Sequence, residues 1–364
     1  MKFAIVLVLS LIVCPSLYAQ SSEKPLTSKE IVALIYQLPK YPGKRDEVIE
    51  EIRRRGIGFP LTDGMRSLVA TKSGNDAALR RTLEEAERRR VNPTGSALPS
   101  EAEGNELLAK TQEATLAATE AMPDFIVRQL IKRAIAYGHT SNWIPLDNLT
   151  IAVSYRATAG EEYKVLTVNG LPLVQQANES KEYGDVVGGS TSTGEYVTGL
   201  ANIFRPRASA EFKMVDTDVL RGRRTIVYEF LVLRAFSQLT LKAERDMVTT
   251  AGSRGRVWVD RETNRVLRFE QIATEIPGDF PITAASSMID YEWVTIADKP
   301  YLLPSHADIY ITSTYRGETR QSRNEIRFRG YQKYGAELKV VDEIDDSDLP
   351  PEKPEPPPQP PKKP

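Results

Sequence analysis

The segment from Thr225 to Arg234 constrains the fold of this 364-residue chain more than any other stretch. Successive side chains of a β-strand point to opposite faces, so a strand with one solvated face alternates apolar and polar residues. In this segment one face carries Ile226, Tyr228, Phe230 and Val232, and the other carries Val227, Leu231 and Leu233. Because both faces are apolar, the segment predicts a strand that is covered on both sides.

The longer region from Phe125 to Tyr334 has the period of two that is typical of strands. Short turns separate its apolar runs, so consecutive strands are expected to pair as antiparallel hairpins. The clearest hairpins join residues 151–155 to 163–168, 208–219 to 223–234, and 255–260 to 265–271, and segments 288–296, 307–315 and 322–331 continue the meander. The sequence predicts an α+β protein with a strongly curved antiparallel sheet, an unclosed β-barrel.

The hairpin over residues 255–271 is predicted to be structural. Period two places Val257, Val259, Leu267 and Phe269 in the core and leaves Arg256, Arg268 and Glu270 in solvent. The aromatic residues Trp258, Tyr291 and Trp293 are interpreted as packing or sheet-surface residues, and contact with a ligand in an open barrel is the less favoured alternative.

Helices are expected to cover the concave side of this sheet, because a convex outer face normally needs no cover. A long helix opens with a capping box of Ser100 and Glu103, and a shorter helix is predicted to be capped by Ser192 and Glu195. The residues predicted to line a ligand cavity between helix and sheet are Tyr196, Leu200, Ile226, Tyr228 and Phe230.

The N-terminus has the pattern of an export signal. Lys2 precedes an apolar run over residues 3–13 that is too short to span a bilayer, and Ala19 offers a small residue for cleavage. We therefore expect a signal peptide over residues 1–19 and a periplasmic or extracellular location. A lipoprotein signal anchored through Cys14 is the less favoured alternative, because Val13 stands where such signals prefer Gly, Ala or Ser.

Four parts are expected after the signal peptide. Residues 20–92 read as a small helical domain, and residues 93–99 as a linker rich in turn-forming residues. The half-barrel with its lid helices is assigned to residues 100–340. Residues 341–364 form an acidic and then proline-rich tail, which is predicted to be disordered and to act as a spacer.

Composition and motifs argue against several classes of function. The 48 basic residues nearly balance 49 acidic ones, so no global charge favours nucleic acid. His139 and His306 are too few for a histidine-rich metal site, and the glycine-rich segment 188–192 lacks the ending of a phosphate loop. The sequence predicts no catalytic residue, metal or cofactor, and no transmembrane segment after the signal.

The layout resembles that of a known family. The export signal, the long helix, residues 122–125 (Met-Pro-Asp-Phe), the paired hairpins and the hairpin joining residues 257–260 to 265–268 are similar to the periplasmic lipoprotein-carrier superfamily. That superfamily includes the lipoprotein localisation factors LolA and LolB and the envelope-stress sensor RseB. The segment 301–304 (Tyr-Leu-Leu-Pro) also resembles a group of exported bacterial proteins of unknown function.

The resemblance covers about residues 100 to 335 and implies an unclosed β-barrel with a helical lid. It carries over no ligand-contacting residue, because no motif matches position by position. Two function classes follow: a noncatalytic envelope protein that binds a lipid or a lipoprotein acyl chain, or a protein-interaction or sensor module with an envelope protein as its partner. An enzyme of unknown reaction is the third hypothesis.

Overall fold

The computed structural model describes residues 23–335, except residues 95, 141, 174–182, 197 and 244–246. The expected signal peptide with Cys14 and the expected acidic and proline-rich tail lie outside the described residues.

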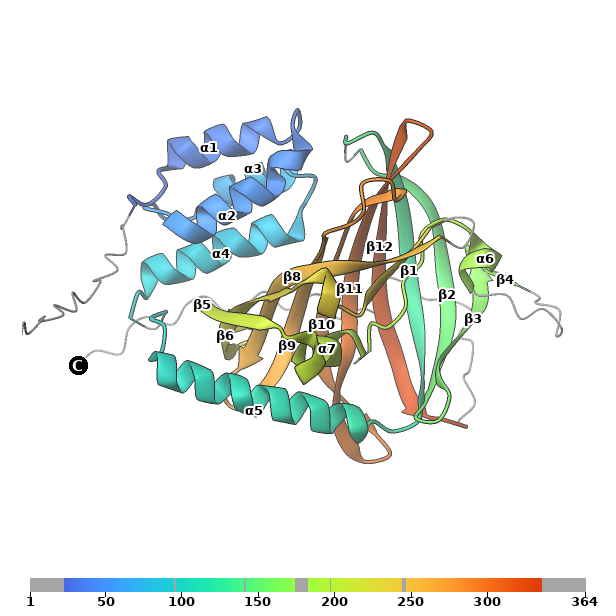
Figure 1. Ribbon diagram of the computed structural model, residues 1–364. Coiled ribbons are helices and arrows are strands. Elements are labelled where there is room, and N and C mark those ends of the chain that lie inside the picture. Colours follow the sequence, from blue (N-terminus) through green and yellow to red (C-terminus); the bar gives the residue numbers. More distant parts are fainter. Residues whose placement is uncertain are drawn as a thin grey trace, which may run out of the picture.

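One large antiparallel sheet dominates the structure (Figure 1). Its strands follow the order β4-β3-β2-β1-β12-β11-β10-β9-β8-β6-β5, with β7 paired to β8 beside this path. The strands are β1 (Phe125–Tyr137), β2 (Ile144–Arg156), β3 (Gly160–Val168), β4 (Leu171–Pro172), β5 (Glu211–Leu220), β6 (Arg223–Val232), β7 (Leu239–Lys242), β8 (Val248–Asp260), β9 (Arg265–Thr274), β10 (Ile282–Ile296), β11 (Lys299–Tyr315) and β12 (Glu318–Lys333). The two ends of this path do not pair with each other, so the sheet is unclosed. The α+β class and the predicted hairpins are confirmed.

The helices fall into two groups in the chain. The first group is α1 (Ser28–Gln37), η1 (Pro42–Lys44), α2 (Arg45–Arg55), α3 (Asp63–Lys72) and α4 (Ala77–Val91), and the second is α5 (Glu101–Glu120), α6 (Tyr183–Val187), α7 (Thr198–Phe204), η2 (Pro206–Ala208) and η3 (Arg234–Phe236). Helices α1 to α4, with the segments that join them, share a hydrophobic cluster of their own. The predicted capping box of Ser100 and Glu103 is present at the start of α5, and Thr27 and Glu30 form another at the start of α1.

Helix α7 begins at Thr198, so the prediction of a helix capped by Ser192 was wrong. The side chain of Glu195 is buried, not placed at a helix start, and is only 3% exposed. The backbone N–H of Gly194 donates to Glu161 Oε2 on β3 at 3.0 Å. Contacts with a distant strand therefore override the local capping pattern.

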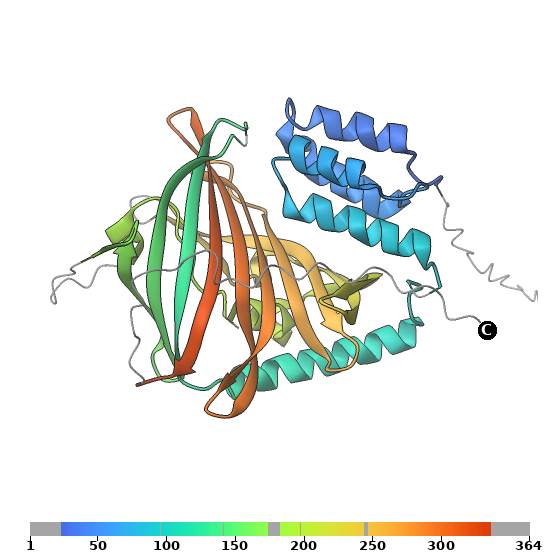
Figure 2. The ribbon, with the colours of Figure 1, turned by 180° about the vertical axis from the view of Figure 1, so that it is seen from behind.

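Helices pack on both faces of the sheet around β6, β8 and β9. On one face, Tyr228 donates its hydroxyl to the carbonyl oxygen of Gly104 on α5 at 2.7 Å, and Phe230 stacks on Phe269 at 5.6 Å between ring centroids. Figure 1 shows α7 inside the hollow of the curved sheet, and Figure 2 shows helices α1 to α4 beside the outer face. The prediction that the convex face needs no cover was wrong.

The outer face carries charged pairs between the α1–α4 group and the sheet. Arg88 on α4 pairs with Asp218 on β5, and Trp258 donates its indole N–H to the same carboxylate at 3.0 Å. Burial, and then the neighbouring Asp218, raises the pKa of Glu85 on α4 above its usual range. Arg88 offsets the burial of Asp218 and lowers its pKa. Glu85 is therefore protonated beside an ionised Asp218.

The hairpin of β8 and β9 differs from its prediction on this outer face. Val257, Val259, Leu267 and Phe269 are buried as predicted, although a bulge places Val266 opposite Val259. The prediction that Arg256, Arg268 and Glu270 lie in solvent was wrong. Arg268 is 5% exposed and forms an ion pair with Asp290 at 2.7 Å. Glu270 forms ion pairs with Arg53 and Arg81, and Arg256 forms ion pairs with Glu229 and Glu50. The alternation of side chains along a strand assigns each residue to a face of the sheet. Only the packing of the helices decides whether that face is shielded from water.

Cover on the outer face is partial. Val227 is 3% exposed, whereas Leu231 and Leu233, further along the chain, are 37% and 49% exposed. The prediction that the whole segment is covered on both sides therefore holds only for its first half.

We expect Gly255→Ala to destabilise the protein by at least about 1–3 kcal/mol, the usual cost of overpacking. An added Cβ would lie 1.8 Å from the carbonyl oxygen of Glu270, and a backbone atom cannot rotate away as a side chain does. Urea denaturation checks this. The control is Gly278→Ala, where the added Cβ meets nothing within 4 Å. Equal midpoints for both variants would contradict the expected close approach of β8 and β9.

We expect Arg268→Ala to cost about 3–5 kcal/mol, because it leaves the buried carboxylate of Asp290 without its main partner. Burial by itself raises the pKa of Asp290, but Arg268 and then Arg221 bring it well below its usual range. Arg261→Ala, at the exposed turn of the same hairpin, should change stability by under about 0.5 kcal/mol. Thermal melts of both variants measure the difference. A small loss of stability in Arg268→Ala would show that the ion pair of Arg268 and Asp290 is accessible to water.

Candidate functional site

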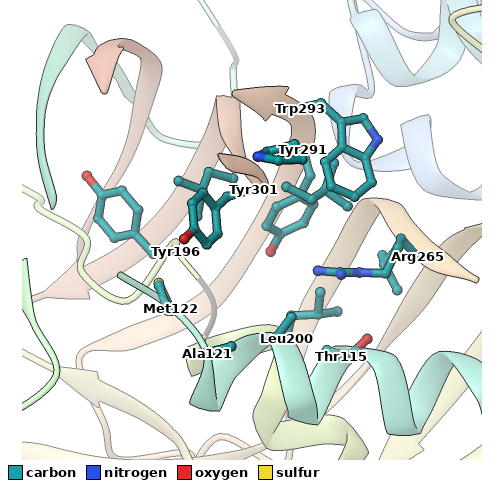
Figure 3. A pocket seen from close by; sticks show the side chains of 14 residues that line it. Thr115, Ala121, Met122, Tyr196, Leu200, Arg265, Tyr291, Trp293 and Tyr301 are labelled. Carbon is teal, nitrogen blue, oxygen red and sulfur yellow. The ribbon is translucent and has the colours of Figure 1, made fainter. Parts of the chain in front are cut away.

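A cavity of about 210 Å³ lies between helices α5 and α7 and the ends of strands β9, β10 and β11. Figure 3 shows its aromatic side chains gathered above the α5 and α7 residues. The lining residues are Thr115, Ala118, Ala121, Met122, Tyr196, Leu200, Arg265, Val266, Tyr291, Trp293, Pro300, Tyr301, Leu302 and Leu303. Most of this lining is apolar or aromatic, which is typical of small-molecule sites.

The cavity exists because α5 packs closely at one end and carries small side chains at the other. Near its start, an added Cβ on Gly104 would lie 2.7 Å from the Met214 sulfur, so helix and sheet are in contact there. Near its end, α5 presents Thr115 and Ala118 to the sheet, and Ala121 follows directly. These short side chains leave space that larger residues would fill.

The pairing of the strands is irregular at two places beside the cavity. The register of β8 and β9 shifts between Trp258 and Val259, and the consecutive residues Arg265 and Val266 both line the cavity. On β10, ordinary alternation separates Asp290, which binds Arg268, from Tyr291, which lines the cavity. The register shift beside them leaves Ser305 of β11 unpaired, so it does not reorient Tyr291.

The structure separates the five predicted cavity residues into two groups. Tyr196 and Leu200 line the cavity. Ile226, Tyr228 and Phe230 are buried in the hydrophobic core and do not line it. The predicted set therefore spans the cavity and the packed core beside it.

Sequence reasoning missed the side chains that give the cavity its character: Arg265, Tyr291, Trp293 and Tyr301. The sequence favours packing or surface roles for Tyr291 and Trp293 over ligand contact, yet both line the cavity. Their spacing of two was a usable signal, because it puts both rings on one face of β10. Nothing local marked Arg265, which immediately follows an ordinary turn.

A buried polar cluster lies beside the cavity. Gln129 donates from Nε2 to the Tyr196 hydroxyl at 3.3 Å, and the Tyr163 hydroxyl donates to Glu161 at 2.5 Å. Burial is the largest effect on Glu195 and, together with the neighbouring Glu161, raises its pKa to about 7. A hydrogen bond from Ser192 acts in the opposite direction and lowers the pKa. Glu195 does not line the cavity.

Tyr291 and Arg265 are the polar groups of interest in the lining. Burial and then Glu195 raise the pKa of Tyr291 well above its usual range, so its hydroxyl stays protonated. Burial lowers the pKa of Arg265, and its guanidinium lies 5.7 Å from the centre of the Trp293 ring. Both side chains are hydrogen-bond donors at neutral pH.

The described part of the chain contains neither a cluster of metal ligands nor a helix that could span a membrane. Within those residues, no group of three or more His, Cys, Asp or Glu side chains is placed to hold a metal ion. None of the helices described is long and apolar enough to cross a membrane.

We expect Glu195→Gln to reduce the pH dependence of stability. The folded-state pKa of about 7 lies above the ordinary 4.5, so the wild type loses stability as pH rises between these values. The loss corresponds to about 3 kcal/mol, since one pKa unit is about 1.4 kcal/mol. Urea denaturation at pH 4.5 and pH 8 measures it. The exposed Glu120→Gln on α5 should keep the wild-type slope, and an unchanged slope in Glu195→Gln would contradict the assignment.

Comparisons with known proteins give weak structural matches only. No protein-family model matches the sequence, and no curated protein matches it. A DUF1329 family protein from Desulfovibrio piger matches with 9% identity and a TM-score of 0.28, over 64% of this chain and 95% of that chain. MucB in complex with MucA(peri) matches with 9% identity and a TM-score of 0.18, over 61% of this chain and 94% of that chain. The MucA/MucB complex of Pseudomonas aeruginosa matches with 10% identity and with the same TM-score and coverage. TM-scores this far below 0.5 assign this chain to no family.

Proposed function

We propose that this chain is a noncatalytic exported protein that binds the apolar part of a lipid or acyl chain in the cavity between α5 and the sheet. The observation that carries the proposal is the cavity itself, with its lining of aromatic and aliphatic side chains. Removing apolar ligand surface from water stabilises the complex in proportion to the area buried. The apolar N-terminal run, read as an export signal, supports an envelope or extracellular setting.

The cavity volume favours a narrow ligand. At about 210 Å³ it exceeds the roughly 150 Å³ cavity that accepts a benzene ring, and it is smaller than the roughly 300–1,000 Å³ of sites for drug-sized molecules. Beside the cavity, packed rings occupy part of the hollow: Phe204 stacks on Phe212 at 5.3 Å between centroids. We therefore propose a single acyl chain, inserted over part of its length, as the ligand.

Filling the cavity tests the proposal. We expect Ala118→Phe to lower the affinity for a fluorescent fatty acid by about tenfold or more, because the ring would occupy the space of the ligand. The matched control is Ala117→Phe, which adds the same ring to the exposed side of α5 and should bind as the wild type does. Fluorescence titration measures both, and thermal melts verify that both variants are folded.

Mass spectrometry of gently purified wild-type protein provides an independent measurement. A co-purified acyl compound that Ala118→Phe lacks would support the proposal. Absence of any such compound, together with no fatty-acid uptake by the wild type, would refute lipid binding and favour the protein-interaction alternative.

A further inference from the structure

Arg265 places a cation in a cavity that is otherwise mainly apolar. It is the first residue of β9, and Figure 3 shows its side chain extending into the cavity from the side of Trp293. The guanidinium lies 5.7 Å from the centre of the Trp293 ring. An aromatic ring can hold a guanidinium by its face and leave the N–H edges available to donate.

Neighbouring arginines have carboxylate partners, whereas Arg265 has none among the described residues. Arg268 binds Asp290 at 2.7 Å, and Arg223 binds Asp260 at 2.6 Å and Glu262 at 3.0 Å. The acidic groups close to Arg265 in sequence are therefore engaged by other arginines. A partly buried cation without a counter-charge is costly, and an anionic ligand would offset that cost.

The Tyr291 hydroxyl is a second donor without a partner in the described structure. Tyr291 is 2% exposed, and its hydroxyl oxygen has no hydrogen-bond partner there. Figure 3 shows this hydroxyl and the Arg265 side chain directed into the same part of the cavity. Buried polar groups in proteins are normally hydrogen-bonded, so a buried hydroxyl that faces a cavity indicates a ligand atom that accepts from it.

We propose that Arg265 and Tyr291 together bind the anionic head group, a carboxylate or a phosphate, of a single-chain amphiphile whose apolar chain lies toward Met122, Tyr196 and Leu200. This inference rests on the proposed function and adds the chemical class of the ligand. The Arg265 guanidinium only donates, and the protonated Tyr291 hydroxyl can donate its proton, so the pair suits an oxyanion. The planar guanidinium can donate two parallel hydrogen bonds to a carboxylate or phosphate.

The test compares three ligands that share one chain: dodecanoate, dodecyl phosphate and the neutral dodecanol. Isothermal titration calorimetry with the full chain measures each affinity. We expect the wild type to bind at least one of the two anions about tenfold or more tightly than dodecanol, since a charge-assisted hydrogen bond adds that much. The anion that binds more tightly identifies the head group.

Variants assign the preference to the two donors. Arg265→Gln should lower the affinity for the preferred anion by roughly 10- to 100-fold and leave dodecanol binding unchanged. Arg261→Gln removes the same charge at the exposed turn outside the cavity and should bind as the wild type does. Tyr291→Phe should weaken anion binding by about threefold to tenfold; it removes a hydroxyl that has no partner in the described structure, so folding should persist even where Arg265→Gln is unstable.

The outcomes separate this inference from the proposed function. Equal binding of dodecanol and both anions, or anion binding that neither Arg265→Gln nor Tyr291→Phe weakens, would overturn the head-group assignment and leave apolar binding intact. Failure of the wild type to bind any of the three ligands would overturn both. Loss of the anion preference in folded Arg265→Gln or Tyr291→Phe would support the assignment.

Discussion

The structure depends on covering the β6, β8 and β9 region of the sheet from both sides. Tyr228 and Phe230 point toward α5, while Val227 and Trp258 lie on the side of the α1–α4 group and are also buried. Strands with two apolar faces are unstable in water unless both faces are covered. The two groups of helices therefore have complementary roles, and the sheet between them is their common core.

Charges, in addition to apolar contacts, connect the outer cover to the sheet. Ion pairs join Arg88 to Asp218 and Arg89 to Asp216, and Glu270 forms ion pairs with both Arg53 and Arg81. Removing one partner of such a pair leaves a buried charge, so the pairs penalise any shifted arrangement of α2 and α4 on the strands. Burial and the neighbouring Asp218 raise the pKa of Glu85, which favours its protonated form in this arrangement.

The cavity lies where the inner cover becomes thin. Gly104 lets α5 touch the sheet near its first turn, whereas Thr115 and Ala118 leave a gap near its last turns. Arg265 at the start of β9 and Tyr291 on β10 line that gap. The same sheet that forms the core thus provides, at the ends of β9 to β11, an aromatic space that includes the donors Arg265 and Tyr291, on which the proposed acyl-chain and head-group binding rests.

The sequence by itself determined the local features: the α+β class, the antiparallel hairpins, the Ser100 cap, and the inward face of the β8–β9 hairpin. These depend on side-chain alternation and on hydrogen bonds between neighbours in the chain. Only the tertiary structure decided that Arg268 is buried and that Glu195 does not cap a helix. It also decided that Arg265 lines a cavity together with Tyr196 and Leu200, whereas Ile226 lies in the packed core. Periodicity assigns a side chain to a face, but burial and cavity lining depend on elements that are distant in the sequence and pack there in the fold.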